Sequence, residues 1–359
     1  MKLPSFSKYP EEFYRSLPKV DLHRHLEGSL RFETIRELAR QHGMDLPATA
    51  ELRTMVQIQE GEKLTFQNFL SKFSTLRLFY RSPEIISRIT QEAIADAAAD
   101  NVRYLELRFT PVALSKAQGF PLAQVMDWVI AGAQQAEKDY GVITKLIASV
   151  NRHESVALAA QVSYLAAERR EAGIVGMDLA GNEAEYDSEP FVDVFQNAKM
   201  EGLHMSIHAG EWASGDNVTH AINRLGAERI GHGIRVLDSH TATRLSRDRQ
   251  TPFEVCITSN YQSGVIADVA VHPVVEMLEQ GLNVTINSDD PSISNIRLSD
   301  EYRLVCEVLG LRVAALIERV LAAAQAAFLP EADKERLVKE LENEVADCLR
   351  RYQLPAGAD

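Results

Sequence analysis

Two histidines separated by one residue, His23 and His25, end a short apolar run near the start of the chain. In an extended strand, side chains two residues apart point to the same face, so the two imidazoles would lie together. Paired imidazoles suit a divalent transition metal, and zinc is the first choice for this ligand type. An HxH pair alone is weak evidence, because some such pairs are satisfied core residues.

Two further candidate ligands stand at the ends of other apolar runs. His208 ends the run 203–208, and Asp289 follows the run 282–287. Three nitrogen ligands and one oxygen ligand from three separate segments are rarely assembled by chance, which favours a metal site. A catalytic zinc keeps one position open and lowers the pKa of a water there to about 7. The ligand set therefore predicts a hydroxide nucleophile at neutral pH.

Three polar residues at strand ends are candidates for the rest of the chemistry. His232 ends the run 229–232 and is placed to take or orient the proton of the water. Glu211, three residues past His208, is a candidate acid beside the electrophile. Asp290 is free to bind substrate, or it could cap a helix that begins at Pro291. Position alone does not decide between these two roles.

The elements that must position these residues form a repeating pattern. Short β-branched runs cover 19–25, 102–109, 142–150, 174–179, 203–208, 229–232, 253–258 and 282–287. Stretches with helical periodicity, such as 121–139 and 155–171, separate most of them. Eight such units predict an α/β fold, a closed (β/α)₈ barrel of the TIM type whose active site lies after the strands. No GxGxxG sequence supports an open doubly wound sheet.

Two segments exceed what a minimal barrel needs. The first, 28–101, is longer than one crossover helix, and such insertions are usually functional lids or extra packing layers. Apolar residues recur within it at helical spacing, at Phe66, Phe69, Leu70 and Phe73. The second, beyond residue 298, predicts two or three helices ending in the amphipathic segment 331–351. We expect one domain over 1–359, with a helical lid insertion within 28–101.

The composition excludes several classes of protein. The 359 residues include 38 Lys and Arg against 51 Asp and Glu, a net charge of −13. This balance argues against a nucleic-acid partner, because phosphate binding needs a basic face. Three dispersed cysteines predict no disulfide framework and a reducing compartment. Without a signal segment or a bilayer-spanning run, we expect a cytoplasmic protein with no membrane partner.

Other polar residues near the strand ends receive structural interpretations. Arg24, between two candidate ligands, is expected to form an ion pair away from the metal. Cys256 is expected to pack as a small apolar residue, since no base is evident near it. Ser259 and Asn260 have no assignable role. The remaining histidines, among them His272, are interpreted as surface or helix residues.

Taken together, the motifs resemble the adenosine deaminase family of metal-dependent hydrolases. They are PKVDLHRHLEGSL, YLELRFTP, MDLAGNE, HAGE, ERIGHGI, CITSNYQSG, INSDDPS and AAFLPEADKERL, in this order along nearly the whole chain. The resemblance implies a zinc-bearing (β/α)₈ barrel that replaces the 6-amino group of an adenine ring with oxygen and releases ammonia. A second metal is not expected, because dinuclear relatives bridge their metals with a modified lysine where this chain has MDLAGNE.

The resemblance also implies a role for each matching position. One zinc ion per subunit would be bound by His23, His25, His208 and Asp289. Glu211 would protonate the purine N1, and His232 would orient and help deprotonate the water that attacks C6. Asp290 would hydrogen-bond N7, and the backbone of Gly181 would face N3.

At the sugar end, the resemblance places His25 and Glu27 near the ribose 5′-hydroxyl. A hydrophobic gate over the pocket would be formed by Phe66, Phe69, Leu70 and Phe73. Many family members carry Asp in place of Glu27, whereas Glu also occurs in relatives that act on adenine or modified nucleosides. Arg108 and Thr110 of LRFTP look more like the nucleoside enzymes.

The resemblance therefore favours a purine-salvage enzyme that acts on adenosine and also on 2′-deoxyadenosine. One alternative is a sister deaminase for free adenine or for an adenosine-like intermediate such as aminodeoxyfutalosine. A non-catalytic protein that binds a metal or a nucleoside is a weaker alternative, because it would have no chemical need for Glu211 and His232. The oligomeric state is not predicted.

Overall fold

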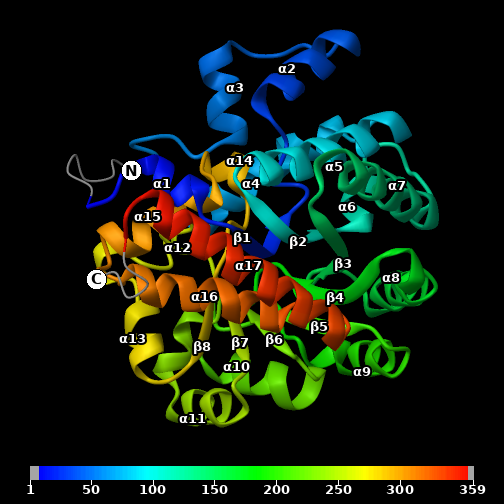
Figure 1. The fold of residues 1–359 in the computed structure, drawn as a ribbon. Helices are drawn as coiled ribbons and strands as arrows, with labels where there is room; N and C mark the ends of the chain where they lie inside the picture. Colours follow the sequence, from blue (N-terminus) through cyan, green and yellow to red (C-terminus); the bar gives the residue numbers. More distant parts are fainter. Residues whose placement is uncertain (1–7, 355–359) are drawn as a thin grey trace.

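Eight parallel strands form the centre of the computed structural model, which describes residues 8–354 (Figure 1). The strands are β1 (Lys19–His25), β2 (Val102–Phe109), β3 (Ile143–Asn151), β4 (Ile174–Ala180), β5 (His204–His208), β6 (Arg229–Gly231), β7 (Pro252–Val255) and β8 (Asn283–Ile286). Each strand pairs with the next one along the chain. This order confirms the predicted (β/α)₈ barrel of the TIM type.

The barrel closes between β8 and β1 through Asp289, three residues past the end of β8. The amide of Asp289 donates to the carbonyl of His23 at 2.7 Å, and the amide of His25 donates to the carbonyl of Asp289 at 2.9 Å. Two residues before Asp289, the side-chain oxygen of Asn287 accepts from the amide of Leu22 at 2.9 Å. The closing hydrogen bonds thus bring three predicted metal ligands together.

Helices surround the sheet, and several of them pack directly against its strands. After α1 (Glu11–Ser16), those between the strands include α5 (Pro83–Ala99), α6 (Pro111–Ser115), α7 (Leu122–Tyr140), α8 (Val156–Ala167), α9 (Val192–Met200), α10 (Asp216–His220), α11 (His240–Arg249), α12 (Ile257–Gln262) and α13 (Val274–Glu279). Shorter turns are η2 (Arg170–Ala172), η3 (Glu189–Phe191), η4 (Ala221–Leu225), η5 (Ile234–Asp238) and η6 (Val269–Val271). Ser82 caps α5 by accepting from the amide of Ile85, and Pro83 opens its first turn.

The segment 28–101 contains three extra helices ahead of the barrel's own first crossover helix, α5. They are α2 (Phe32–Gln41), α3 (Thr49–Val56) and α4 (Phe66–Leu76), and η1 (Arg77–Phe79) continues α4. Figure 1 shows α2 and α3 in blue at one edge of the molecule. The hydroxyl of Thr65 caps α4 by accepting from the amide of Asn68 at 3.2 Å.

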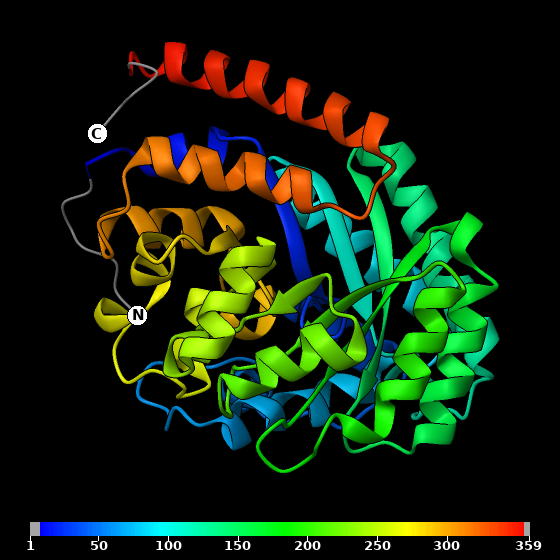
Figure 2. The same cartoon turned by 90° about the horizontal axis from the view of Figure 1, so that it is seen from below.

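The chain ends in helices that cover β8 and β1. A short α14 (Pro291–Ser294) is followed by α15 (Leu298–Glu307), α16 (Val313–Ala326) and α17 (Glu331–Arg351). Helix α16 packs on β8 and β1, and α17 lies outside it, as Figure 2 shows in orange and red. The amphipathic segment predicted at 331–351 is α17. Within residues 8–354, no helix is both long and apolar enough to cross a membrane.

The seventh predicted run, 253–258, is wrong at its end. The strand stops at Val255, and the β-branched residues after it begin α12. The buried carboxylate of Glu301 accepts from the amides of Ile257 at 2.7 Å and Thr258 at 3.2 Å. These amides are among the unpaired donors at a helix start, so a distant acid overrides the local preference for a strand.

Candidate active site

One cavity at the C-terminal ends of the strands gathers the predicted site residues. Its lining includes His25, Glu27, Phe69, Leu70, Phe73, Gly181, His208, Glu211, His232, Asp289 and Asp290. His23, the remaining predicted residue, is fully buried beside them. The structure therefore brings the predicted site residues to one place, except Phe66, which does not line the cavity.

The four candidate ligands lie within reach of a common centre. One carboxylate oxygen of Asp289, Oδ1, is 3.4 Å from Nε2 of His23 and 3.4 Å from Nε2 of His25. Ring nitrogens of His23, His25 and His208 lie within 4.8 Å of one another. Nε2 of His23 is buried and has no hydrogen-bond partner within the residues that the structure describes. An orphaned imidazole nitrogen among three donors is the arrangement that a divalent metal fits.

Buried carboxylates orient two of the imidazoles. Nδ1 of His23 lies 2.8 Å from Oε2 of Glu254, and Nδ1 of His208 lies 2.8 Å from Oδ1 of Asp178. A proton on each Nδ1 leaves the Nε2 lone pair free for a metal. Arg108 joins the two acids, at 2.6 Å from Glu254 and 3.4 Å from Asp178. Although burial opposes ionisation, His208 and Arg108 hold the pKa of Asp178 below its usual range.

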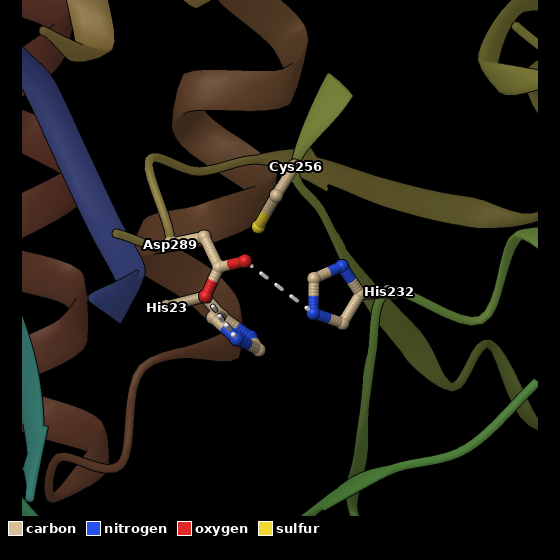
Figure 3. A group of neighbouring side chains, drawn as sticks. All are labelled: His23, His232, Cys256 and Asp289. Carbon is tan, nitrogen blue, oxygen red and sulfur yellow. Dashed lines mark ion pairs between the residues drawn. The ribbon is translucent and has the colours of Figure 1, made fainter. Parts of the chain in front are cut away.

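Cys256 stands closer to this centre than its expected packing role implies. Figure 3 shows it beside Asp289, which lies between His23 and His232. One donor atom from each of these four residues falls within 4.8 Å of the others. Burial raises the pKa of the Cys256 thiol, and Sγ contacts the carbonyl of Glu254 at 3.5 Å. Both features favour the thiol over the thiolate that binds metals, so Asp289 with three imidazoles is the better ligand set.

Glu211 is set to carry a proton. Burial, followed by the nearby charges of Asp289 and Glu183, raises its pKa well above the ordinary value of a glutamic acid. One of its oxygens, Oε2, lies 3.8 Å from Nε2 of His232. A neutral carboxylic acid at this position can donate a proton to a ligand.

A second glutamate, Glu183, holds the loop that carries Glu211. Its carboxylate accepts from successive backbone amides of this loop, those of Gly210, Glu211, Trp212 and Ala213. It also accepts from the side-chain amide of Asn217 at 3.0 Å. MDLAGNE places Glu183 at the end of β4, but no spacing in the sequence links it to this loop.

Asp290 does not cap the short helix that follows it. Its side chain makes no capping hydrogen bond, and the buried Oδ1 has no partner among residues 8–354. Burial, followed by Asp289 and Glu27, raises the pKa of Asp290 well above its usual value, which favours a neutral donor. A β-carbon on Gly28 would lie 1.7 Å from Oδ1, so only glycine lets this carboxyl enter the cavity.

The cavity also contains polar groups away from the candidate ligands. Oε1 of Glu27 accepts from the amide of Thr110 at 2.7 Å, whereas its buried Oε2 has no partner in the described range 8–354. Arg77, which sequence reasoning missed, lines the cavity too. Gly181 adopts a φ of 92°, a conformation that brings its backbone to the wall without a side chain.

Helix α4 forms the roof of the cavity. Phe69, Leu70 and Phe73 line the interior. Phe66, expected on the same gate, instead stacks on Trp212, with ring centroids 5.3 Å apart and planes at 29°. This contact joins the roof to the loop that carries Glu211.

Comparison with known proteins places these features in a family. A family model described as adenosine deaminase matches residues 18–344. An adenosine deaminase from Clostridium botulinum (strain 657 / Type Ba4) is 34% identical over 331 residues, which cover 92% of this chain and 99% of that protein. The adenine deaminase of Arthrobacter aurescens has a TM-score of 0.85 at 30% identity, covering 92% of this chain and 99% of that one. Arabidopsis ADAL complexed with GMP has a TM-score of 0.83 at 27% identity, covering 94% and 99%.

Proposed function

Because the chain belongs to the adenosine deaminase family, we propose that it hydrolyses adenosine and 2′-deoxyadenosine to the corresponding inosines and ammonia, in purine salvage. The observation that carries this proposal is the meeting of an N,N,N,O donor set with a proton-carrying Glu211 in one cavity. Addition of water to an aromatic C=N bond needs a nucleophile and a proton for the nitrogen. The two groups supply these complementary needs.

One zinc ion is the metal that suits this donor set. Its ligands would be His23, His25, His208 and Asp289. When bound, zinc lowers the pKa of a water and so supplies a nucleophile at neutral pH. Glu254 and Asp178 keep the imidazoles oriented for this task through their hydrogen bonds to Nδ1.

The remaining residues would bind and activate the purine. Glu211 donates its proton to N1, which draws electrons away from C6. Asp290, whose Oδ1 lacks a partner in the described part of the chain, hydrogen-bonds N7. His232, whose Nε2 lies 3.8 Å from both Glu211 and Asp289, orients the attacking water. The backbone of Gly181 faces N3.

Polar groups beyond those that an adenine ring needs support a nucleoside as substrate. Oε2 of Glu27 is buried and has no hydrogen-bond partner among the described residues, and a sugar hydroxyl would satisfy it. Thr110 and Arg77 line the same cavity. Free adenine is the second candidate, because an adenine deaminase is 30% identical to this chain over most of its length.

Ammonia release from several purines tests the proposal. The zinc-loaded protein would be offered adenosine, 2′-deoxyadenosine, adenine, aminodeoxyfutalosine and AMP at equal concentrations. We expect kcat/KM for adenosine to exceed that for adenine on the order of 10²-fold or more, since Glu27 would otherwise stay unpartnered. Glu27→Gln should narrow this ratio by weakening adenosine turnover. Turnover confined to adenine, AMP or aminodeoxyfutalosine would assign a sister activity. Absence of turnover with all five compounds would indicate a non-catalytic binding protein.

A further inference from the structure

A chain of buried hydrogen bonds leads from the backbone of α13 to His232. The amide of Val274 lies 3.1 Å from Nδ1 of His272, and Nε2 of His272 lies 3.2 Å from Oδ1 of Asn260. Nδ2 of Asn260 lies 3.2 Å from Nδ1 of His232. The side chains of Asn260, His232 and His272 are buried, with exposures of 0%, 1% and 5% of each residue. The sequence assigned no role to Asn260, and the interpretation of His272 as a surface or helix residue is wrong, because His272 is buried between η6 and α13.

The direction of every bond in this chain follows from its first donor. A backbone amide can only donate, so Nδ1 of His272 must accept and its proton must lie on Nε2. Burial lowers the pKa of His272 to about 3, which keeps the ring neutral with that single proton. Nε2–H of His272 can bond only an acceptor, which fixes the carbonyl oxygen of Asn260 on its side.

The same logic then reaches the cavity. With its oxygen engaged by His272, Asn260 presents its NH₂ group to Nδ1 of His232. Nδ1 must therefore be an acceptor, and the neutral ring carries its proton on Nε2. In Figure 3 this edge of His232 faces Asp289, and Oδ2 of Asp289 and Oε2 of Glu211 each lie 3.8 Å from Nε2.

We propose that Asn260 and His272 are positioning residues that fix His232 in the Nε2–H tautomer. His232 then presents a hydrogen-bond donor to the attacking water and has no lone pair at Nε2 with which to remove its proton. That proton would pass to solvent instead, because a bound zinc would lower the pKa of the water to about 7. This inference rests on the proposed function and changes one part of it. His232 holds the water and stabilises the negative charge that develops on its oxygen, whereas the resemblance implied that it also helps to deprotonate the water.

The tautomer can be measured without any substrate. Zinc-loaded protein labelled with ¹⁵N-histidine would be examined by NMR between pH 6 and 8, with the His232 signals assigned by their loss in His232→Ala. We expect Nδ1 to resonate as an unprotonated nitrogen and Nε2 as a protonated one. A proton on Nδ1 of His232 would overturn the proposal. Because the spectrum needs no turnover, a failure of the proposed function with every purine would leave this result readable.

Asn260→Asp reverses the link to His232. A carboxylate accepts from His272 as before but cannot donate, so His232 should move a proton to Nδ1. We expect this shift together with a loss of kcat on the order of 10²-fold and a smaller change in KM. Asn197→Asp, which adds the same charge on the exposed face of α9, is the matched control. An unchanged His232 spectrum in Asn260→Asp would contradict the proposal.

A neutral pair of variants separates hydrogen bonding from charge. His272→Leu removes the donor that holds Asn260, so both tautomers of His232 should become populated and kcat should fall. His272→Gln keeps an amide that can accept from Val274 and donate to Asn260, so it should restore the parental spectrum and most of kcat. Zinc content and melting temperature of both variants report whether the fold survives. Equal behaviour of the two variants would rule out the directional chain.

Discussion

The cavity has a floor of residues at or after the strand ends, which includes His23, His25, His208 and Asp289, and a roof formed by α4. The floor and the roof are built from different interactions. On the floor, the backbone of Asp289 is hydrogen-bonded to His23 and His25 on β1. Two buried acids, Glu254 and Asp178, are hydrogen-bonded to the imidazoles of His23 and His208. On the roof, α4 contributes apolar side chains, such as Phe73 and Phe66, from a helix outside the barrel. The floor depends on the placement of charges, whereas the roof depends on contact area.

This difference implies that the floor determines the chemical reaction, whereas the roof determines how substrate enters and binds. Floor residues lie at or just after strand ends, where backbone hydrogen bonds join Asp289 to His23 and His25, which suits groups that must keep their geometry through a reaction. The roof reaches the catalytic loop through the Phe66–Trp212 stack, and such an aromatic contact contributes about 0.5–1.5 kcal/mol. Floor substitutions should therefore change metal content or kcat, and roof substitutions should change KM.

The largest effect should come from His208→Ala on the floor. The variant loses one of four metal ligands, so purified protein should lose both its zinc and its deaminase activity. Metal analysis and ammonia release measure the two together. Zinc at one equivalent per chain in this variant would contradict the ligand assignment.

Glu211→Gln should remove proton donation without affecting metal binding. Gln keeps the size of the side chain and its neutral charge but cannot give a proton to N1. We expect normal zinc content and a kcat lower by on the order of 10²–10⁴-fold. Turnover like that of the parent would show that another group protonates the ring. His232→Ala should likewise retain zinc and lose activity.

The contact between Glu301 and the start of α12 should depend on pH. Burial raises the pKa of Glu301 to about 7, and its carboxyl group holds the start of α12, which carries Asn260. The folded state keeps a proton that the unfolded chain releases near its ordinary pKa of about 4.5. Stability should therefore fall by roughly 3 kcal/mol as pH rises from about 4.5 through 7.

Glu301→Gln removes that titration while keeping a side chain that can accept from the amide of Ile257 and donate to the hydroxyl oxygen of Thr258. Urea unfolding of the parent and of Glu301→Gln at several pH values measures the difference in slope. We expect a flatter profile for the variant over this pH window. Parallel profiles would mean that Glu301 is ionised in the folded protein throughout the range.

Much of the floor could be predicted from local pattern. The strands at 19–25 and 102–109 match the observed β1 and β2, and the period of two in HRH correctly predicts that His23 and His25 share a face. A barrel places all strand ends on one side, so His208 and Asp289 follow from the fold class. These predictions rest on spacing and topology, which are readable in a single chain.

The supports of the floor could not be predicted in this way. Glu254 contacts His23 across 231 residues of chain, and Glu301 contacts Thr258 across 43. No periodicity selects which of many acids reaches a given imidazole or amide, because that choice is made by packing. For the same reason the helix at Ile257–Gln262 and the position of Cys256 had no local signal.

Asp178→Asn tests one of these unpredicted supports. The amide can no longer serve as an ionised acceptor for Nδ1–H of His208, so the orientation of this ligand weakens. We expect zinc affinity to fall about 10- to 100-fold, measured by competition with a chelator. Asp193→Asn, on the exposed side of α9, is the matched control and should bind zinc like the parent. Equal affinities in the two variants would remove Asp178 from the metal site.

The smallest effect should come from the roof, with Phe66→Ala. Loss of the stack on Trp212 removes about 0.5–1.5 kcal/mol of contact between α4 and the catalytic loop, which corresponds to roughly a 2- to 12-fold change in KM for adenosine. Zinc content should stay at the parental value and kcat should change less than KM, because no floor residue contacts Phe66 through this stack. The fluorescence of Trp212, recorded in a Trp128→Phe background, reports the loss of the stack. A large fall in kcat would show that the roof also orders Glu211, because Trp212 is adjacent to it and Glu183 holds both of their amides.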